Sequence, residues 1–239
     1  LLYLLCGVSY ISVDLLFPVV QKITNHRDDG RYSLIHSSEY VLDGLIYRLN
    51  YDSMKKGYHP IRKEIIDAFI KQLQAMQSHY SKIFAFRFDL SVPEGMHVTE
   101  SNVLVSNLFE RLRGRFKKKA WNEQPIKKFA YGWVREKKAA NQVHYHCWIA
   151  LPYFQVQTAG FGNTGMIGLI SELWDELTDN ISRVHLAENS RYSIVRGDHD
   201  SLVDFVERIS YLAKNSGKFS SGEGQRIFST SKLRMKESN

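Results

Sequence analysis

Large apolar residues alternate with other residues along the stretch from Lys82 to Pro93, whose sequence is KIFAFRFDLSVP. This period of two predicts a β-strand that is half buried and that ends at the proline. The side chains of Arg87 and Asp89 are expected on the face opposite to the apolar residues. Those apolar residues are Phe84, Phe86, Phe88 and Leu90.

The stretch from Gly132 to Pro152 predicts a β-hairpin. Two segments that are rich in aromatic and β-branched residues, 131–137 and 143–151, flank a short polar run. Asn141 in this run can adopt the left-handed conformation that a tight turn requires.

Candidate chemistry lies on one face of this hairpin. His144 and His146 are two residues apart in a strand, so both imidazoles point to the same face. If the turn centres on Ala140, Glu136 lies directly across from His144, although a one-residue shift of register would move it to the other face. Two imidazoles and a carboxylate on one patch form a candidate divalent-cation site. An H-x-H motif alone is a weak signal, and two surface histidines on a sheet edge are the alternative.

Apolar residues recur at helical spacing in several other parts of the chain. We expect helices over residues 37–50, 61–81, 99–119, 166–183 and 202–214, and a short strand over residues 191–196. Ser201 and Asp204 form an expected capping box for the last helix. Arg111, Arg115 and Lys118 lie on the outer face or at the end of the third helix, where a solvated surface is the common explanation.

Between residues 82 and 196 these elements follow the order β-α-β-β-α-β. That order predicts an α+β fold of the ferredoxin-like (RRM-like) kind, with an antiparallel sheet and both helices on one face. The other face is expected to be open and to carry the polar candidates: Arg87, Asp89, Glu136, His144 and His146. We divide the chain into a mainly helical N-terminal region, this core and a basic, partly mobile C-terminal tail, at residues 1–81, 82–217 and 218–239.

The composition of the 239 residues, 44% hydrophobic and 13% aromatic, describes a folded protein. A net charge of +7 favours a polyanionic partner, although many soluble proteins share such an excess. Cys6 and Cys147 are far apart and form no CxxC motif, so no disulfide framework is expected and a reducing cytoplasm is the simplest compartment. Residues 1–20 are largely apolar but contain Asp14 and Pro18, so we expect a packed segment rather than a membrane span.

Tyr211 lies off the apolar stripe of the expected last helix. It shares the opposite surface with Glu207 and Lys214, at helical spacings of four and three residues. A nearby cation favours the oxyanion form of a phenol and can stabilise a phosphate, as a tyrosine nucleophile requires. The chain has 13 tyrosines, so an ordinary exposed tyrosine is the alternative for this position.

Together these motifs resemble those of a known family. A strand ending in RFDLSVP, an HYH with a glutamate eight residues upstream, and a helical YLAK are similar to the three motifs of the HUH replication endonucleases. More narrowly, the combination resembles the filamentous-phage gene-two-type replication initiators and their prophage relatives of the YagK/YfjJ type, over about residues 82–234. Since Glu207 and Asn215 stand where a second tyrosine would lie one turn from Tyr211, the resemblance is to the single-tyrosine class.

The resemblance implies a mechanism. His144 and His146 would hold Mg²⁺ or Mn²⁺ with Glu136 as the third ligand, although imidazole ligands suit Zn²⁺ as well. Tyr211 would attack a phosphate of single-stranded DNA and leave a 5′-phosphotyrosine link. The free 3′-hydroxyl would then prime rolling-circle replication.

The resemblance also implies supporting residues. Lys214 would position the phosphate or stabilise its charge, and Asp89 would orient a metal ligand or reach the metal through water. Trp148, on the same face as His146, would stack a base of the single strand or cap the core. The candidate DNA contacts are Arg87, Arg111, Arg115, Lys118 and Trp148.

The implied partner is a DNA replication origin, single-stranded or supercoiled, together with a host helicase and polymerase. The implied place is the cytoplasm of a bacterial cell whose phage or prophage encodes the protein, and no membrane partner is expected. Two alternatives stay open: a non-catalytic nucleic-acid-binding regulator on the same fold, and an HUH transposase or relaxase.

Overall fold

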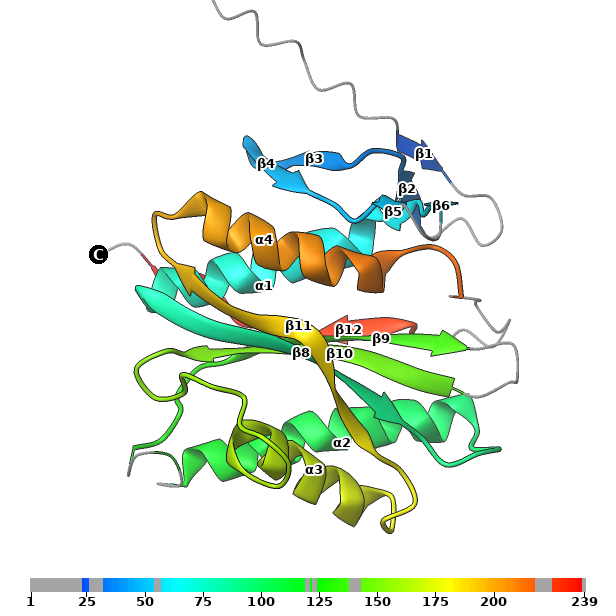
Figure 1. Cartoon of the computed structure of the whole chain (residues 1–239), viewed down its shortest axis with the longest axis vertical. Helices are drawn as coiled ribbons and strands as arrows, with labels where there is room; N and C mark the ends of the chain where they lie inside the picture. The colour runs from blue at the N-terminus through cyan, green and yellow to red at the C-terminus, as the bar shows by residue number, and fades with distance from the viewer. Residues whose placement is uncertain are drawn as a thin grey trace, which may run out of the picture.

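The computed structural model of the chain describes residues 23–25, 32–53, 57–118, 121, 124–137, 143–217 and 225–237. The expectations for residues 1–20, for Cys6 and for the hairpin turn at Ala140 and Asn141 lie outside these described residues. In the described ranges the protein is an α+β structure built on one five-stranded antiparallel sheet (Figure 1).

Five strands, each antiparallel to its neighbours, form this sheet: β8 (Lys82–Ser91), β9 (Ala130–Lys137), β10 (Val143–Pro152), β11 (Val184–Val195) and β12 (Phe228–Thr230). Their order across the sheet is β11-β8-β10-β9-β12. The first predicted strand and the predicted hairpin are confirmed as β8, β9 and β10. β11 is longer than the strand expected at 191–196, because its pairing with β8 continues beyond an irregularity between Leu186 and Arg191.

Four helices cover the sheet, two on each face: α2 (Val98–Lys117) and α3 (Gly165–Leu177) on one, α1 (Lys63–His79) and α4 (His199–Ser210) on the other (Figure 1). The expected open face is therefore wrong. Its physical cause is visible in β10, which carries apolar residues on both faces. Ile149 packs in the core beneath α2 and α3, whereas Trp148 and Ala150 pack beneath α1 and α4. A strand that is buried on both faces carries apolar residues at successive positions, and such a run indicates that both faces of the sheet are covered.

The helices expected over residues 61–81 and 99–119 are confirmed as α1 and α2. α3 ends earlier than expected, because Asp179 and Asn180 adopt left-handed conformations. Ile181, which was expected on the buried stripe of that helix, is 70% exposed. None of the helices in the described ranges combines the length and apolar character that a bilayer span requires.

α4 begins earlier than the expected 202–214. Its N-cap is Asp198, whose carboxylate accepts a hydrogen bond of 3.2 Å from the backbone N–H of Ser201. The expected capping box of Ser201 with Asp204 is therefore wrong. A 3₁₀ turn, η1 (Tyr211–Ala213), follows α4 directly, so Tyr211 stands where the α-helix ends.

The helix expected over residues 37–50 is wrong, as is the mainly helical character of the described part of residues 1–81. The segment forms a hairpin of β3 (Glu39–Leu42) and β4 (Leu45–Arg48). Between these strands Asp43 and Gly44 both have positive φ angles, 51° and 77°, as a two-residue Asp-Gly turn requires. The other short strands of this region are β1 (Ile23–Asn25), β2 (Ser33–Ile35), β5 (Asp52–Ser53), β6 (Gly57–Tyr58) and β7 (Ile61–Arg62).

The described part of the expected C-terminal tail is instead packed on the fold. β12 lies beside β9 at the edge of the sheet, and Ile227 just before it is buried in the core under α1 and α4. The carbonyl of Ile227 accepts a hydrogen bond of 2.7 Å from the backbone N–H of Arg135. Residues 225–237 of the expected tail therefore contact the sheet and α1.

Candidate functional site

The three candidate metal ligands lie together on the face of the sheet that α4 covers. Strand pairing places His144 directly opposite Glu136 of β9, so the register expected from the sequence is confirmed. One ligand atom from each of Glu136, His144 and His146 lies within 4.8 Å of the others. The centroids of the two imidazole rings are 4.7 Å apart. Two ligand atoms that each lie about 2.1 Å from one cation can be up to about 4.2 Å apart. Small shifts of these side chains would therefore bring all three ligand atoms within bonding distance of one ion.

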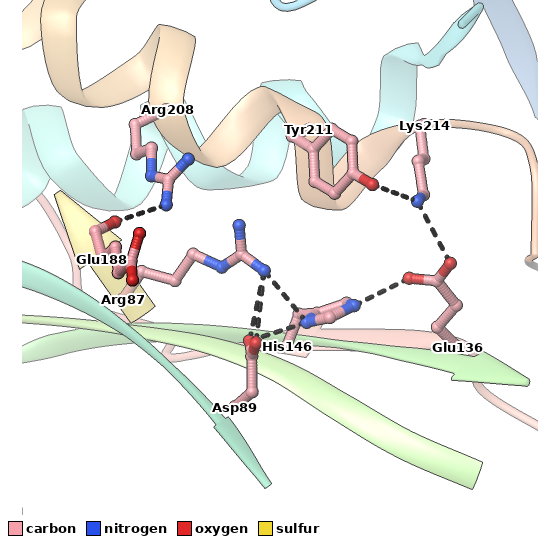
Figure 2. A network of polar contacts seen from close by, with 8 residues as sticks. All are labelled: Arg87, Asp89, Glu136, His146, Glu188, Arg208, Tyr211 and Lys214. Atoms are coloured by element: carbon pink, nitrogen blue, oxygen red, sulfur yellow. Dashed lines mark hydrogen bonds and ion pairs between the residues drawn. The ribbon is translucent and has the colours of Figure 1, made fainter. Parts of the chain in front are cut away.

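A carboxylate contacts each nitrogen of the His146 ring (Figure 2). Nδ1 lies 2.6 Å from Oδ1 of Asp89, and Nε2 lies 2.7 Å from Oε2 of Glu136. A neutral imidazole has one N–H and can donate to only one of these carboxylates. Either the ring carries both protons, or a cation takes the place of the proton between Nε2 and Glu136. The donor set therefore fits a divalent cation, and Asp89 would hold the ring with Nε2 directed towards such an ion.

Arg87 extends this network beyond Asp89. Its Nη2 lies 3.3 Å from Oδ1 of Asp89 and 3.2 Å from Nδ1 of His146. Because the contact of Nδ1 with the carboxylate is shorter, we assign Nδ1 as a donor to Asp89, and Arg87 as a second donor to that carboxylate. Burial of Asp89 would raise its pKa, but the hydrogen bond with His146 and the charges of His146 and Arg87 together hold that pKa below its ordinary value. Asp89 is therefore ionised at neutral pH.

Tyr211 reaches this cluster from the other side, through Lys214. The Nζ atom of Lys214 lies 2.7 Å from the hydroxyl oxygen of Tyr211 and 3.2 Å from Oε1 of Glu136 (Figure 2). The side chains of Lys214 and Glu136 are only 11% and 12% exposed, so solvent screens this pair weakly. The convergence expected from the sequence is present: the phenol, the lysine, the carboxylate and His146 form one continuous network.

The main chain around Lys214 is held by the strand region before α1. Lys214 forms a β-bridge with Ile61, and the backbone N–H of Asn215 donates a hydrogen bond of 2.7 Å to the carbonyl of Pro60. These contacts fix the η1 turn over the sheet. They also give residues 60–62 a structural role in the site that no sequence pattern predicts.

Gly217 is a further residue that the sequence analysis missed. Its φ angle is 76°, and an added Cβ would lie 2.6 Å from Oε1 of Glu136. A side chain at this position would be strained and would displace the carboxylate. Glycine therefore allows the chain to pass directly over Glu136.

Arg208, which the sequence analysis also missed, lies one turn before Tyr211. Its Nη2 donates a hydrogen bond of 2.6 Å to the carbonyl of Glu188 (Figure 2). Burial, followed by the nearby charge of Arg87, lowers the pKa of Arg208. Among the described residues, no hydrogen-bond partner exists for the buried Nε of Arg208 or of Arg87. The i, i+3 spacing of Arg208 and Tyr211 was the available sequence signal, because it places both side chains on one side of the helix.

The other residues expected to contact DNA lie away from this cluster. The expected stacking role of Trp148 is wrong, because its ring is fully buried between Phe69 and Phe205, with centroids 5.4 and 6.2 Å away. Arg111 and Arg115 lie on the opposite layer and form ion pairs with α3.

The ion-pair partners of these two arginines are residues of α3: Glu176 lies 2.8 Å from Arg111, and Glu172 lies 2.6 Å from Arg115. Lys118 is exposed just beyond the end of α2. Of the five expected DNA contacts, Arg87 is the one that joins the cluster.

Comparison with known proteins identifies a family for this chain. A family model described as the YagK/YfjJ C-terminal domain matches residues 46–231, which include every residue of the cluster. No curated protein and no solved structure matches the chain.

Proposed function

The chain belongs to the YagK/YfjJ C-terminal domain family, and we propose that it is an HUH-type, metal-dependent endonuclease that nicks and rejoins single-stranded DNA to initiate rolling-circle replication. The observation that carries this proposal is the position of Lys214 between the Tyr211 hydroxyl and Glu136. A phenol, a lysine cation and three candidate metal ligands share one site, and this combination suits covalent cleavage of a phosphodiester.

The arrangement of the sheet supports the proposal. Between β8 and β11 the elements follow the order β-α-β-β-α-β, and α2 and α3 cover the same face of an antiparallel sheet. These features agree with a ferredoxin-like core. On this interpretation α1, α4, β12 and the N-terminal strands are additions, and α4 with η1 delivers Tyr211 to the sheet.

The metal in this proposal is Mg²⁺ or Mn²⁺, held by His144, His146 and Glu136. Such an ion supplies Lewis-acid polarisation of the scissile phosphate. The contribution of the chain is geometric: the strand register brings the three ligands together, and Asp89 fixes the orientation of the His146 ring.

Tyr211 is the nucleophile. Its oxygen forms a bond to phosphorus while the bond from phosphorus to the 3′ oxygen breaks. The phenol proton passes through water to the departing 3′ oxygen, so the products are a 5′-phosphotyrosine and a free 3′-hydroxyl. Lys214 stabilises the phenolate before attack and the phosphate oxygens during it. Attack by a 3′-hydroxyl on the phosphotyrosine reverses the step and rejoins the strand.

In this proposal Arg87 and Arg208 bind a neighbouring phosphate of the DNA strand, on the side of Tyr211 away from Lys214 (Figure 2). The guanidinium carbon of Arg87 lies 5.7 Å from the centroid of the Tyr211 ring. Two neighbouring guanidinium groups repel each other, and a phosphate between them would relieve this repulsion and pair with their planar donors. Among the described residues, the buried Nε atoms of Arg87 and Arg208 have no hydrogen-bond partner, so both can donate to such a phosphate.

A second candidate function is a non-catalytic nucleic-acid-binding regulator. The observation that favours it is the contact of Glu136 with both His146 and Lys214, which satisfies the polar network without an ion. In that case His144→Ala would leave DNA affinity unchanged, and no metal would produce cleavage.

A covalent-adduct assay tests the proposal. The protein is incubated with Mn²⁺ and labelled single-stranded oligonucleotides that cover its replication origin, and the denatured products are separated by size. Wild type is expected to form a protein–DNA adduct, and Tyr211→Phe is expected to form none. Tyr192→Phe, which alters a nearby tyrosine that packs on Phe205, is the matched control and should form the adduct. An undiminished adduct from Tyr211→Phe would overturn the assignment.

A further inference from the structure

A basic cleft lies near the first residue of β9, away from the metal-ligand cluster. Its volume is about 450 Å³, and it lies between the end of α2, the segment that leads into β9 and the segment that follows β12. Its lining residues are Arg113, Lys117, Pro125, Ile126, Lys127, Lys128, Phe129, Ser231, Lys232 and Leu233.

The charge of this basic cleft has one sign. Five of the ten lining residues are lysine or arginine, and none is acidic. Glu110, outside the lining, approaches Arg113 at 3.4 Å, but both side chains are well exposed and such pairs contribute little. Five cations around one concave surface attract an anion with several charges.

The basic residues of α2 divide into two groups. Arg111 and Arg115 form close ion pairs with glutamates of α3, at 2.8 and 2.6 Å, whereas Arg113 and Lys117 face the basic cleft. One side of α2 is therefore basic but ion-paired with α3. The other side faces the basic cleft, whose lining contains no acidic residue.

The apolar walls indicate which part of a nucleic acid would bind here. Phe129 and Ile126 are 8% and 3% exposed, so neither offers a free aromatic face for a base to stack on. The guanidinium carbon of Arg113 lies 5.9 Å from the centroid of the Phe129 ring, which helps to hold this arginine in place. A site with many cations and no stacking surface suits the phosphate backbone rather than the bases.

The distance to the metal-ligand cluster sets the length of the ligand. Phe129 precedes β9 and Glu136 lies near its end, so seven steps of about 3.3 Å separate them, about 23 Å along the strand. A short oligonucleotide at the cluster would not reach the basic cleft, whereas a longer one could.

We propose that this basic cleft binds backbone phosphates of single-stranded DNA at a distance from the cleaved phosphate. The inference rests on the proposed function, since it assigns the cleft to the same DNA strand. It adds an anchoring site that gives affinity without reading sequence.

The test is the salt dependence of binding by the full chain, without metal. Fluorescence anisotropy is measured with oligonucleotides of about 16 and about 4 nucleotides, the range of single-strand site sizes. The cleft variant is Lys127→Gln with Lys128→Gln, two exposed lysines whose loss should not unfold the protein. The matched control, Arg111→Gln with Arg115→Gln, removes the same charge from ion-paired positions. Thermal unfolding is recorded for each variant.

For the long oligonucleotide, the slope of log affinity against log salt is expected to become shallower by about 1.4 in the cleft variant, as for two lost phosphate contacts. The control variant and the short oligonucleotide should show no such change. An unchanged slope in the cleft variant, an equal change in the control, or tighter binding of RNA than of DNA of the same sequence would overturn the inference. The adduct assay separates the two proposals. A wild-type adduct with an unchanged slope refutes only the cleft, and a shallower slope without any adduct refutes only the endonuclease.

Discussion

The Nζ atom of Lys214 donates a hydrogen bond of 2.7 Å to the hydroxyl of Tyr211, three residues earlier in the chain. The 3₁₀ turn that follows α4 brings these side chains together, and the same nitrogen reaches Glu136 on β9 at 3.2 Å. Lys214 therefore connects Tyr211, in the turn after α4, to the cluster of candidate metal ligands on the sheet.

Replacing Lys214 should slow DNA cleavage. Lys214→Met keeps much of the side-chain length but removes the charge that stabilises both the phenolate and the phosphate, so adduct formation should slow by about 10²–10³-fold. Lys214→Arg should recover part of this loss. Single-turnover rates of adduct formation measure both effects. A Lys214→Met protein that cleaves at the wild-type rate would remove Lys214 from the mechanism.

Asp89→Asn should weaken metal binding. The amide cannot hold the protonated Nδ1 of His146 as the carboxylate does at 2.6 Å, so Mn²⁺ affinity is expected to fall about 10–100-fold. Isothermal titration of the purified protein with Mn²⁺ gives the affinity. Asp204→Asn, which changes a carboxylate on the exposed side of α4, should bind Mn²⁺ like wild type. Equal affinity in Asp89→Asn and wild type would contradict the orienting role.

Asp89 should also make stability depend on acid pH. Its folded-state pKa is lowered, so its contribution is fully present above the unfolded pKa of about 3.9 and is lost as pH falls through the folded value. The free energy of unfolding in urea, measured from pH 6 downwards, should fall less steeply with acid in Asp89→Asn than in wild type. Parallel profiles for the two proteins would show that the network does not stabilise the ionised carboxylate.

Trp148 should matter for stability and not for DNA binding. Its ring is fully buried against Phe69 and Phe205, so Trp148→Ala should lower the free energy of unfolding by about 3–5 kcal/mol. Trp148→Phe, which keeps an aromatic ring in the core, should bind single-stranded DNA with wild-type affinity. A tenfold loss of DNA affinity in a folded Trp148→Phe protein would restore the stacking hypothesis.

Arg208→Gln should weaken phosphate binding next to Tyr211. The salt slope of single-stranded DNA binding is expected to become shallower by about 0.7, the value for one phosphate contact, and adduct formation should slow. Arg48→Gln is the matched control, because Arg48 pairs with Asp204 and Glu207 on the exposed side of α4. If both variants change the slope equally, the effect is one of net charge and the phosphate role of Arg208 is wrong.

Local periodicity was sufficient to predict β8, β9 and β10 and the facing of the candidate metal ligands. The period of two places Phe86 and Phe88 under α2 and α3 and leaves Asp89 beside His146, as the structure has them. The register of Glu136 with His144 followed from the placement of the turn. These two predictions depend on the geometry of one strand or one hairpin, whereas the contact of Asp89 with His146 also requires β8 to pair with β10.

Features that depend on distant parts of the chain were not predictable in this way. The second helical layer covers a face that was expected to be open, and only the apolar residues on both sides of β10, such as Trp148 and Ile149, indicate it. The error at residues 37–50 has a local cause instead, because the turn preference of Asp43 and Gly44 outweighed the helical spacing of the apolar residues. Arg208 depends on the irregular part of β11, which brings the carbonyl of Glu188 to it.

The most direct test of the central claim is to locate the DNA attachment point by mass spectrometry of the digested protein–DNA adduct. The account predicts a nucleotide joined through its 5′ phosphate to the peptide that contains Tyr211, and an otherwise identical peptide without it when Mn²⁺ is omitted. Attachment to any other residue, or the absence of a modified peptide with origin DNA and Mn²⁺ present, would contradict it.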